Sequence, residues 1–324
     1  MIVITGGAGF IGSALVWKLN TLGHKNLLVI DQDAKASSKW NNIKGLSFEG
    51  CLESSEFLEK LEKKEFNGKI SAIFHMGACS STTEMNKTYL KENNSGYSER
   101  IAKWCIQNNV YLGYASSAAT YGDGKLGFSD DDLLTPRLKP LNPYGQSKLD
   151  FDIWVLKNKF ENKITGFRFF NVYGPNEYHK ADMRSMVQKG FEQIRDTGKL
   201  RLFKSYKKEY PDGGQKRDFI YVKDVVDAML WFYQHPEIKG IYNLGQGAAE
   251  SWNTLAEALF KAMGKPKNIE YFEMPDSIKN QYQYYTAADM SKLRKTGCPA
   301  HFKNLERGVQ DYVLNYLLKQ NPYL

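Results

Sequence analysis

The chain has 324 residues, and 44 Lys and Arg against 36 Asp and Glu give it a formal net charge of +8. A hydrophobic content of 42% and a charged content of 25% suit one large globular domain or two fused ones. No apolar run approaches membrane-spanning length and the N-terminus enters a predicted strand at once, so we expect a cytoplasmic protein with no membrane partner.

The distribution of charge and of cysteines argues against further classes of protein. The lysines are dispersed, with only short clusters such as 204–208, so we expect anionic small molecules as partners and no nucleic acid. The cysteines, Cys51, Cys79, Cys105 and Cys298, are widely spaced and include no C-x-x-C pair. This spacing argues against a zinc site and a disulfide framework, so we expect free thiols and no metal.

A glycine-rich turn follows the first predicted strand, the apolar run Ile2–Ile4. The spacing is Gly6-x-x-Gly9-x-x-Gly12, and apolar residues then recur at helical spacing over 10–19. Gly6 allows the tight turn, Gly9 lets the backbone approach a pyrophosphate, and Gly12 lets helix and strand pack closely. The helix N-terminus directs free N–H groups at the phosphates. A glycine-rich loop can stand at the beginning of any α/β domain, but the succession of strand, turn and helix favours dinucleotide binding.

The second predicted strand, 27–31, ends in an acidic residue about 20 residues after the glycine turn. Asp31 could hold a ribose 2′-hydroxyl, which favours NAD. Lys35 and Lys39 could instead neutralise a 2′-phosphate, which favours NADP. These residues alone leave both cofactors open.

Predicted strands and helices alternate through the first 170 residues, which is typical of βαβ units and a parallel sheet. We therefore predict an α/β protein, with a Rossmann-type doubly wound parallel sheet and a smaller α/β substrate-binding domain. Beyond about residue 171 the alternation weakens, and a sheet pattern returns at 218–222, where Asp224 is expected to cap the next helix. The predicted domains are 1–170 plus 218–246 for the cofactor, and 171–217 plus 247–324 for the substrate.

A turn of small residues follows the predicted strand that ends at His75. Gly77 and Ala78 permit close passage of a dinucleotide over the end of this strand. His75 itself is interpreted as a structural residue. The polar run 80–84 could line a site or cap a helix.

Two asparagines stand in the middle of the next predicted helix. Asn93 and Asn94 are poor helix formers, so their presence there calls for another reason. We expect them to contact a cofactor or to brace a loop.

A serine, a tyrosine and a lysine form the candidate catalytic set. Ser117 follows the predicted strand 110–114, at the end where parallel sheets place chemistry. Tyr144 and Lys148 lie one turn apart on a predicted helix, and a nearby ammonium lowers a phenol pKa from about 10 toward working pH. The set could carry the proton of a hydride transfer, with Ser117 binding the same oxygen. Tyr-x-x-x-Lys alone is common, but after the glycine turn and the serine strand it is specific.

Longer blocks resemble the extended short-chain dehydrogenase/reductases that act on nucleotide sugars, and among these the ADP-heptose 6-epimerases. The likeness spans nearly the whole chain, and the block from Gly77 to Glu84 is its most selective part. The blocks that carry it are Gly77–Glu84, Tyr114–Gly122, Gly166–Pro175, His179–Lys180, Arg217–Val222, Asn243–Gly245 and Tyr282–Thr286.

The resemblance implies an isomerase with bound NADP. Such enzymes oxidise the C6″ hydroxyl of ADP-D-glycero-D-manno-heptose to a ketone and return the hydride to the opposite face, which gives ADP-L-glycero-D-manno-heptose for lipopolysaccharide core biosynthesis. Tyr144 then matches the first acid/base, Lys180 the second base and Lys148 the cofactor-binding lysine. Two bases suit an inversion because protons move on both faces of the ketone. Without the resemblance, Lys180 would be interpreted as a solvated loop lysine.

The resemblance also implies which residues bind the cofactor. Lys39 matches the 2′-phosphate lysine of the family, whereas Gly50 and Ser54 depart from its pattern, so NADP is expected and NAD is less favoured. The cofactor positions are Gly6, Gly9, Phe10, Ile11, Gly12, Asp31, Gln32, Lys39, Met76, Gly77, Ala78, Cys79, Ser80, Asn93, Lys148, Val172 and Lys180.

The substrate implied by the resemblance is an ADP-sugar. Arg217 suits its diphosphate because a guanidinium can bind two phosphate oxygens side by side. The substrate positions are Ser117, Asn171, Asp182, Lys189, Phe203, Lys204, Ser205, Tyr206, Arg217 and Tyr282. Members of the family form ring-like homo-oligomers, and on this ground a pentamer is expected.

Three other functions were weighed against this one. The first is another NAD(P)-dependent nucleotide-sugar epimerase, such as a UDP-hexose 4-epimerase. The second is a nucleotide-sugar 4,6-dehydratase, which would carry an Asp-Glu pair within 117–120, where this chain has Ser-Ala-Ala-Thr. The third, a non-catalytic sensor or scaffold, would have no need of Tyr144, Lys148 and Lys180.

Overall fold

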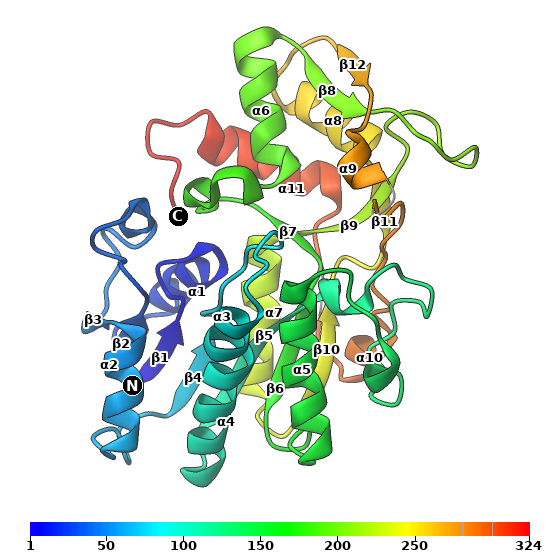
Figure 1. The fold of residues 1–324 in the computed structure, drawn as a ribbon. Helices are drawn as coiled ribbons and strands as arrows, with labels where there is room; N and C mark the ends of the chain where they lie inside the picture. The colour runs from blue at the N-terminus through cyan, green and yellow to red at the C-terminus, as the bar shows by residue number, and fades with distance from the viewer. Residues whose placement is uncertain (280–281, 300) are drawn as a thin grey trace.

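A seven-stranded parallel sheet forms the lower half of the computed structural model, which describes residues 1–279, 282–299 and 301–324 (Figure 1). The strand order is β10-β6-β5-β4-β1-β2-β3, so the order reverses between β1 and β4 and leaves a crevice at their carboxyl ends. The strands are β1 (Ile2–Thr5), β2 (Leu27–Ile30), β3 (Gly50–Leu52), β4 (Ala72–His75), β5 (Tyr111–Ser117), β6 (Thr165–Phe169) and β10 (Gly240–Leu244).

Helices cover both faces of this sheet, because alternate residues of each strand point to opposite sides. Ile4 packs in one apolar cluster with Leu15 of α1 and Met229 of α7. Val3, its neighbour in β1, packs in another cluster with Ile101 of α4 and Val155 of α5. These helices are α1 (Phe10–Thr21), α2 (Ser54–Glu62), α3 (Lys87–Leu90), α4 (Tyr97–Gln107), α5 (Pro143–Lys157), α7 (Val222–Gln234) and α10 (Ser291–Lys295).

A second group of elements lies above the carboxyl ends of the sheet strands in Figure 1. A third apolar cluster holds it together, with Phe191 of α6, Leu259 of α8 and Tyr312 of α11. Its strands are β7 (Asn171–Tyr173), β8 (Leu200–Phe203), β9 (Lys216–Tyr221), β11 (Ala249–Ser251) and β12 (Ile269–Phe272). Its helices are α6 (Met186–Thr197), α8 (Trp252–Ala262), α9 (Asp276–Lys279) and α11 (Leu305–Tyr312).

Short 3-10 and π-helical turns connect these elements. They are η1 (Ser38–Asn42), η2 (Lys91–Gly96), η3 (Ala118–Tyr121), η4 (Thr135–Arg137), η5 (Tyr178–Met183) and η6 (Val313–Leu317). Within the described ranges, no helix is both long enough and apolar enough to cross a bilayer.

The doubly wound parallel sheet with a smaller α/β part confirms the predicted fold class. The assignment of one domain to the cofactor and one to the substrate stays a prediction. Asp224 differs from expectation, because it lies in the first turn of α7 and does not cap it. Its carboxylate instead accepts from the backbone N–H of Lys303 and pairs with the ammonium of that lysine at 2.8 Å.

Candidate active site

A cavity of about 840 Å³ lies where β1, β4 and β5 end and the second group of elements begins. Its wall combines the glycine turn, the loop after β4, the end of β5, the start of α5 and the segment from 169 to 187. This is the crevice that the reversal of strand order creates. Residues from both groups of elements therefore face one space.

The glycine turn has the geometry that the sequence spacing predicts. Gly6 adopts a φ of +63°, and its carbonyl accepts a 2.9 Å hydrogen bond from the N–H of Gly9. A Cβ at Gly12 would lie 2.1 Å from the oxygen of Gly6, so a side chain there would force helix and strand apart. No side chain caps the N-terminus of α1, which leaves its first N–H groups free for an anion.

The acidic residue at the end of β2 already has partners on both oxygens. Asp31 Oδ2 accepts from the N–H of Ala8 at 2.9 Å, and Oδ1 pairs with Lys39 Nζ at 2.9 Å. Lys39 also donates to the carbonyl of Gln32 at 3.3 Å, which engages two of its three N–H groups. Lys39 therefore presents a partly exposed cation beside a largely buried carboxylate.

A chain of buried hydrogen bonds runs beneath the loop after β4. The N–H of Gly77 donates to Thr5 Oγ1 at 3.0 Å, and the Thr5 hydroxyl lies 2.7 Å from His75 Nδ1. The other ring nitrogen, Nε2, lies 2.9 Å from Ser98 Oγ, which donates to the carbonyl of Asn94. Because Ser98 donates to that carbonyl, it accepts from His75, which fixes the Nε2–H tautomer. Burial, with a contribution from the charge of Lys148, lowers the pKa of His75 to about 3 and keeps the ring neutral.

Asn94 continues this chain to the catalytic helix. Its side chain accepts from the N–H of Cys79 at 2.8 Å and donates to the carbonyl of the same residue at 3.1 Å. It also donates to Ser147 Oγ at 2.9 Å, and Ser147 in turn donates to the carbonyl of Tyr144. Asn94 thus braces a loop, one of the two expected roles, while Asn93 lines the cavity.

The catalytic set of the sequence lies together on the cavity wall. Burial raises the pKa of Tyr144 above its ordinary value, and a hydrogen bond with Ser117 opposes the rise. Burial lowers the pKa of Lys148 to about 8, although Asp152 opposes the fall, and its ammonium donates to the carbonyl of Ala115 at 2.9 Å. The pKa of Tyr144 therefore shifts in the direction opposite to the expected lowering by Lys148, because burial raises it.

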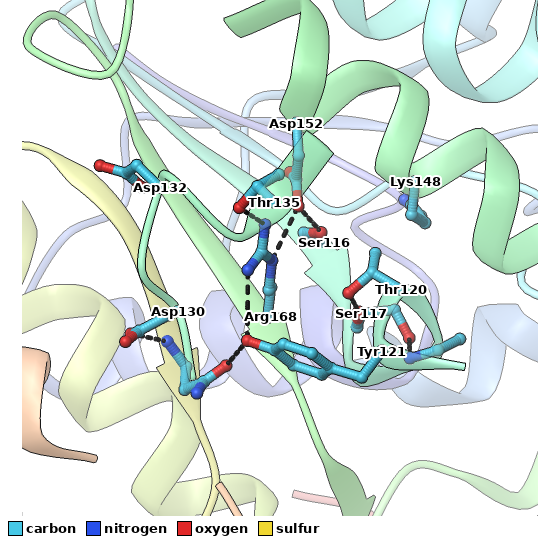
Figure 2. A network of polar contacts seen from close by, with 12 residues as sticks. Ser116, Ser117, Thr120, Tyr121, Asp130, Asp132, Thr135, Lys148, Asp152 and Arg168 are labelled. Atoms are coloured by element: carbon cyan, nitrogen blue, oxygen red, sulfur yellow. Dashed lines mark hydrogen bonds and ion pairs between the residues drawn. The ribbon is translucent and has the colours of Figure 1, made fainter. Parts of the chain in front are cut away.

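A fully buried ion pair supports the floor of this set (Figure 2). Arg168 Nε pairs with Asp152 Oδ2 at 2.9 Å, and the guanidinium also donates to the hydroxyls of Tyr121 and Thr135. Asp152 accepts in addition from Ser116 Oγ at 2.8 Å. Asp152 lies one helical turn after Lys148 in α5, so the ion pair ties this helix to β6 and the bond from Ser116 ties it to the end of β5.

Lys180 reaches the cavity from the opposite group of elements. It lies in η5, with its ammonium 5.3 Å from the ring centroid of Phe10. Burial lowers the pKa of Lys180, and the nearby carboxylate of Glu177 opposes the change. Glu177 is itself buried and accepts from the N–H of Gly174 and the hydroxyl of Ser185, one on each side of the turn. The lowered pKa favours the neutral amine, which is the form that can act as a base.

The family model described as the NAD dependent epimerase/dehydratase family matches residues 2–245. The chain belongs to this family. The resemblance drawn from its motifs to nucleotide-sugar epimerases is confirmed.

Individual members of the family cover the chain almost completely. ADP-L-glycero-D-manno-heptose-6-epimerase of Nitratidesulfovibrio vulgaris (strain DP4) is 47% identical over 100% of both chains. The crystal structure of Helicobacter pylori ADP-L-glycero-D-manno-heptose-6-epimerase is similar with a TM-score of 0.78 and 28% identity, over 97% of this chain and 95% of that one. MoeE5 in complex with UDP-glucose and NAD is similar with a TM-score of 0.71 and 26% identity, over 95% of each chain.

In this chain, all the residues predicted to bind the cofactor or to take part in catalysis line the cavity. Of the substrate positions, Ser117 and Asn171 line it, while among the residues that the structure describes the others lie outside its wall. The positions outside are Asp182, Lys189, Phe203, Lys204, Ser205, Tyr206, Arg217 and Tyr282.

Several of the outlying positions still contact the wall. Trp252 lines the cavity, and its indole N–H donates to the hydroxyl of Tyr282 at 3.0 Å. The guanidinium of Arg217 lies 5.2 Å from the ring centroid of Tyr282 and 5.7 Å from that of Trp252. Lys204 instead pairs with Glu273 at 2.7 Å, away from the cavity.

Some residues that line the cavity of this chain were not indicated by its sequence. Tyr89 and Tyr97 stand four residues before and after Asn93, so helical spacing from Asn93 could have indicated them. Trp252 had no such signal, because a segment distant in sequence brings it to the wall, whereas Ser54 lines the wall at a position that the family resemblance had marked as a departure from its pattern.

Proposed function

We propose that the chain converts ADP-D-glycero-D-manno-heptose to ADP-L-glycero-D-manno-heptose by transient oxidation at C6″ and reduction on the opposite face. The observation that carries the proposal is that Tyr144 and Lys180, on separate groups of elements, line one cavity. An inversion through a ketone needs proton-transfer groups that reach the carbinol from two sides. The full-length relatives of this name support the choice of sugar.

The chain's residues fit a bound dinucleotide. The uncapped N-terminus of α1 and the close approach of Gly12 to Gly6 form a cradle for a pyrophosphate. We propose NADP over NAD, because both oxygens of Asp31 already have partners and the remaining N–H of Lys39 is free to meet a 2′-phosphate. A nicotinamide bound there would supply the reversible hydride acceptance that oxidation of the carbinol carbon requires.

Tyr144 and Ser117 act on the reacting oxygen in this proposal. The phenolate accepts the hydroxyl proton as the ketone forms from one epimer, and the phenol returns that proton when the ketone is reduced to the same epimer; Ser117 donates a hydrogen bond to the same oxygen. Because burial raises the pKa of Tyr144, a nearby cation is needed to favour the phenolate. We assign that charge to Lys148, whose ammonium donates to the carbonyl of Ala115 and is favoured by the charge of Asp152.

Lys180 acts from the other face. Its lowered pKa favours a neutral amine that accepts the proton when the sugar presents the opposite configuration. Glu177 then stabilises the ammonium that results, because its charge opposes the effect of burial.

Arg217 holds the diphosphate of the ADP-sugar in this proposal. Its side chain is buried, and in the described part of the chain no carboxylate pairs with it. Tyr282 and Trp252 flank the guanidinium instead, and its NH1 donates to the carbonyl of Lys216 at 2.8 Å. A buried cation without a counter-charge favours an incoming anion.

The test is to incubate the purified chain with each ADP-heptose epimer and NADP, and to separate the products by chromatography. We expect interconversion from either side. Turnover of UDP-glucose in place of ADP-heptose would identify a UDP-hexose 4-epimerase. The absence of any turnover, with an unchanged biological output for Tyr144→Phe, would favour a sensor.

The cellular role and assembly belong to the same proposal. We expect the chain to supply the heptose of the lipopolysaccharide core in the cytoplasm, and to form a ring-like pentamer. Complementation of a bacterial strain that lacks its ADP-heptose epimerase tests the role. Native mass spectrometry tests the assembly.

A further inference from the structure

Residues 322–324, termed the tail clasp below, pack against the turn that carries Lys180. The hydroxyl of Tyr178 donates to the carbonyl of Pro322 at 2.6 Å. The ring of Tyr178 also meets that of Tyr323 edge-on, with centroids 5.1 Å apart. Asn176 Oδ1 accepts from the N–H of Leu324 at 3.1 Å. The clasp therefore contacts positions two and four residues before Lys180.

The turn needs such contacts because its own backbone is unfavourable. Asn176 has a φ of +76° and Ala181 a φ of +46°, a region that residues with a Cβ rarely adopt. Such conformations persist only when surrounding contacts impose them. Asn176 is fully buried and also donates to Ser13 Oγ of α1 at 3.0 Å, so one amide joins the clasp to the helix behind the glycine turn.

The tail clasp lies outside the chemistry itself. Among the described residues that line the cavity, none belongs to 322–324. The turn from Asn176 to Ser185 is fixed by side-chain contacts with several segments, and the clasp is the part of this set that reaches Tyr178 and Asn176 from the far end of the chain. Other contacts of the turn join Glu177 to Ser185, His179 to Asn42, Asn176 to Ser13, Lys189 to Asp182 and Arg184 to Glu192. Removing the clasp takes away the carbonyl that accepts from the hydroxyl of Tyr178 and the ring of Tyr323, and leaves Tyr178 packed against Tyr312, with ring centroids 6.4 Å apart.

We propose that the tail clasp is a positioning element that holds the turn 176–185, and with it Lys180, against the cavity. This proposal rests on the proposed role of Lys180 as a base. It acts through Tyr178 and Asn176 and touches neither cofactor nor substrate. Loss of the clasp lets the turn depart from its strained conformation, so the amine of Lys180 occupies its reacting position less often. The rate of epimerisation then falls, whereas binding of cofactor and ADP-sugar persists.

The first test compares Tyr178→Phe, removal of residues 322–324, and Tyr242→Phe as a matched control. Tyr242 also donates its hydroxyl to a backbone carbonyl, that of Lys239 at 2.8 Å, but in the sheet and away from the turn. We expect kcat to fall roughly fivefold for Tyr178→Phe and more for the truncation, with KM little changed. Tyr178→Phe should add nothing to the truncation, because the acceptor of its hydroxyl is already absent. Equal effects of Tyr178→Phe and Tyr242→Phe would overturn the proposal.

The second test repeats the truncation in a Lys180→Ala background. If the clasp acts by placing Lys180, the residual rate of Lys180→Ala is the same with and without residues 322–324. If the truncation lowers both backgrounds by the same factor, its effect is on general structure and the proposal fails. Lys180→Ala with the full rate of the parent protein would contradict the proposed base and not the clasp.

The third test needs no substrate. Hydrogen exchange of the whole chain, measured by mass spectrometry, should become faster over 177–185 in the truncated protein and in Tyr178→Phe, while α1 stays protected. Faster exchange at the turn supports the clasp even if the chain proves to act on another sugar. Unchanged exchange at the turn overturns it, whatever the activity assay shows. Tyr178→Phe keeps this test open if the truncated chain fails to fold.

Discussion

The two sides of the cavity are built in different ways. On the side of the seven-stranded sheet, site residues stand at strand ends and are fixed by buried hydrogen bonds, such as those from His75 through Asn94 to Ser147. On the opposite side, Lys180 lies in a short turn whose conformation depends on contacts with distant segments. Arg217 is on a strand of that side, but its charge has no carboxylate partner within the described ranges.

This difference assigns a physical role to each side. A braced wall suits groups that must keep one geometry through oxidation and reduction, because misplacement by about 1 Å can cost 100-fold in rate. The other side carries Arg217, a desolvated cation that an anionic substrate would neutralise, and Lys180, whose pKa burial lowers. Substitution of Tyr144 on the braced wall and of Arg217 on the other side should therefore separate rate from substrate binding.

The largest effect is expected for Tyr144→Phe, on the braced wall. Removing the group that exchanges the proton should lower kcat about 1,000-fold, while the content of bound cofactor stays unchanged. Tyr89→Phe, on the same wall, serves as the control and should retain most activity. Steady-state kinetics with ADP-heptose measures both. A loss of less than tenfold for Tyr144→Phe would mean that another group carries the proton.

A second prediction concerns Arg217, on the side of the cavity opposite the braced wall. Arg217→Met keeps much of the side-chain volume but removes the charge, so KM for the ADP-sugar should rise about 100-fold with a smaller change in kcat. Arg201→Met is the control, because Arg201 is exposed on β8 and already paired with Glu270. If both variants raise KM equally, the effect is one of overall charge and not of a diphosphate site.

The sequence predicted the braced wall better than the other side. Gly6, Gly12, Ser117 and Tyr144 follow or begin regular elements, and a parallel sheet brings the ends of its strands to one edge. Local pattern was therefore enough to place them in one cavity. Lys180 was indicated by family resemblance alone, since nothing in its neighbours distinguishes it from a solvated lysine.

What the sequence could not give was the contacts between distant segments. The sign of the pKa shift of Tyr144 depends on how deeply the folded chain buries the phenol. Trp252 reaches the wall only through tertiary packing, and Asp224 pairs with Lys303 instead of capping its own helix. In each case the deciding partner lies far along the chain.

A third prediction tests the brace through its histidine. The pKa of His75 is lowered to about 3 in the folded chain, against about 6.5 when unfolded, so only the unfolded chain binds this proton between those values. The contribution of His75 to the free energy of unfolding is therefore fully present above pH 6.5 and is lost as the pH falls from 6.5 toward 3. It amounts to roughly 2 kcal/mol between pH 7 and pH 5.

Denaturant unfolding at both pH values checks this expectation. The fall in stability between pH 7 and pH 5 should be smaller in His75→Gln by about that amount, whatever the cost of the substitution at pH 7. An equal fall in both proteins would mean that His75 is protonated in the folded chain. The donors and acceptors in the hydrogen bonds between Gly77 and Asn94 would then differ from those described above.

The smallest effect is expected at the edge of the braced wall, for Lys39→Ala. Lys39 is partly exposed, so its loss should weaken NADP binding only about tenfold. The same change frees one oxygen of Asp31, which can then accept from a ribose 2′-hydroxyl but repels a 2′-phosphate. Binding of NAD should therefore stay the same or improve, and titration calorimetry with both cofactors measures the difference. Lys35→Ala, four residues earlier and outside the cavity wall, is the control. Equal weakening of both cofactors would place Lys39 near the pyrophosphate instead, and would remove the argument for NADP.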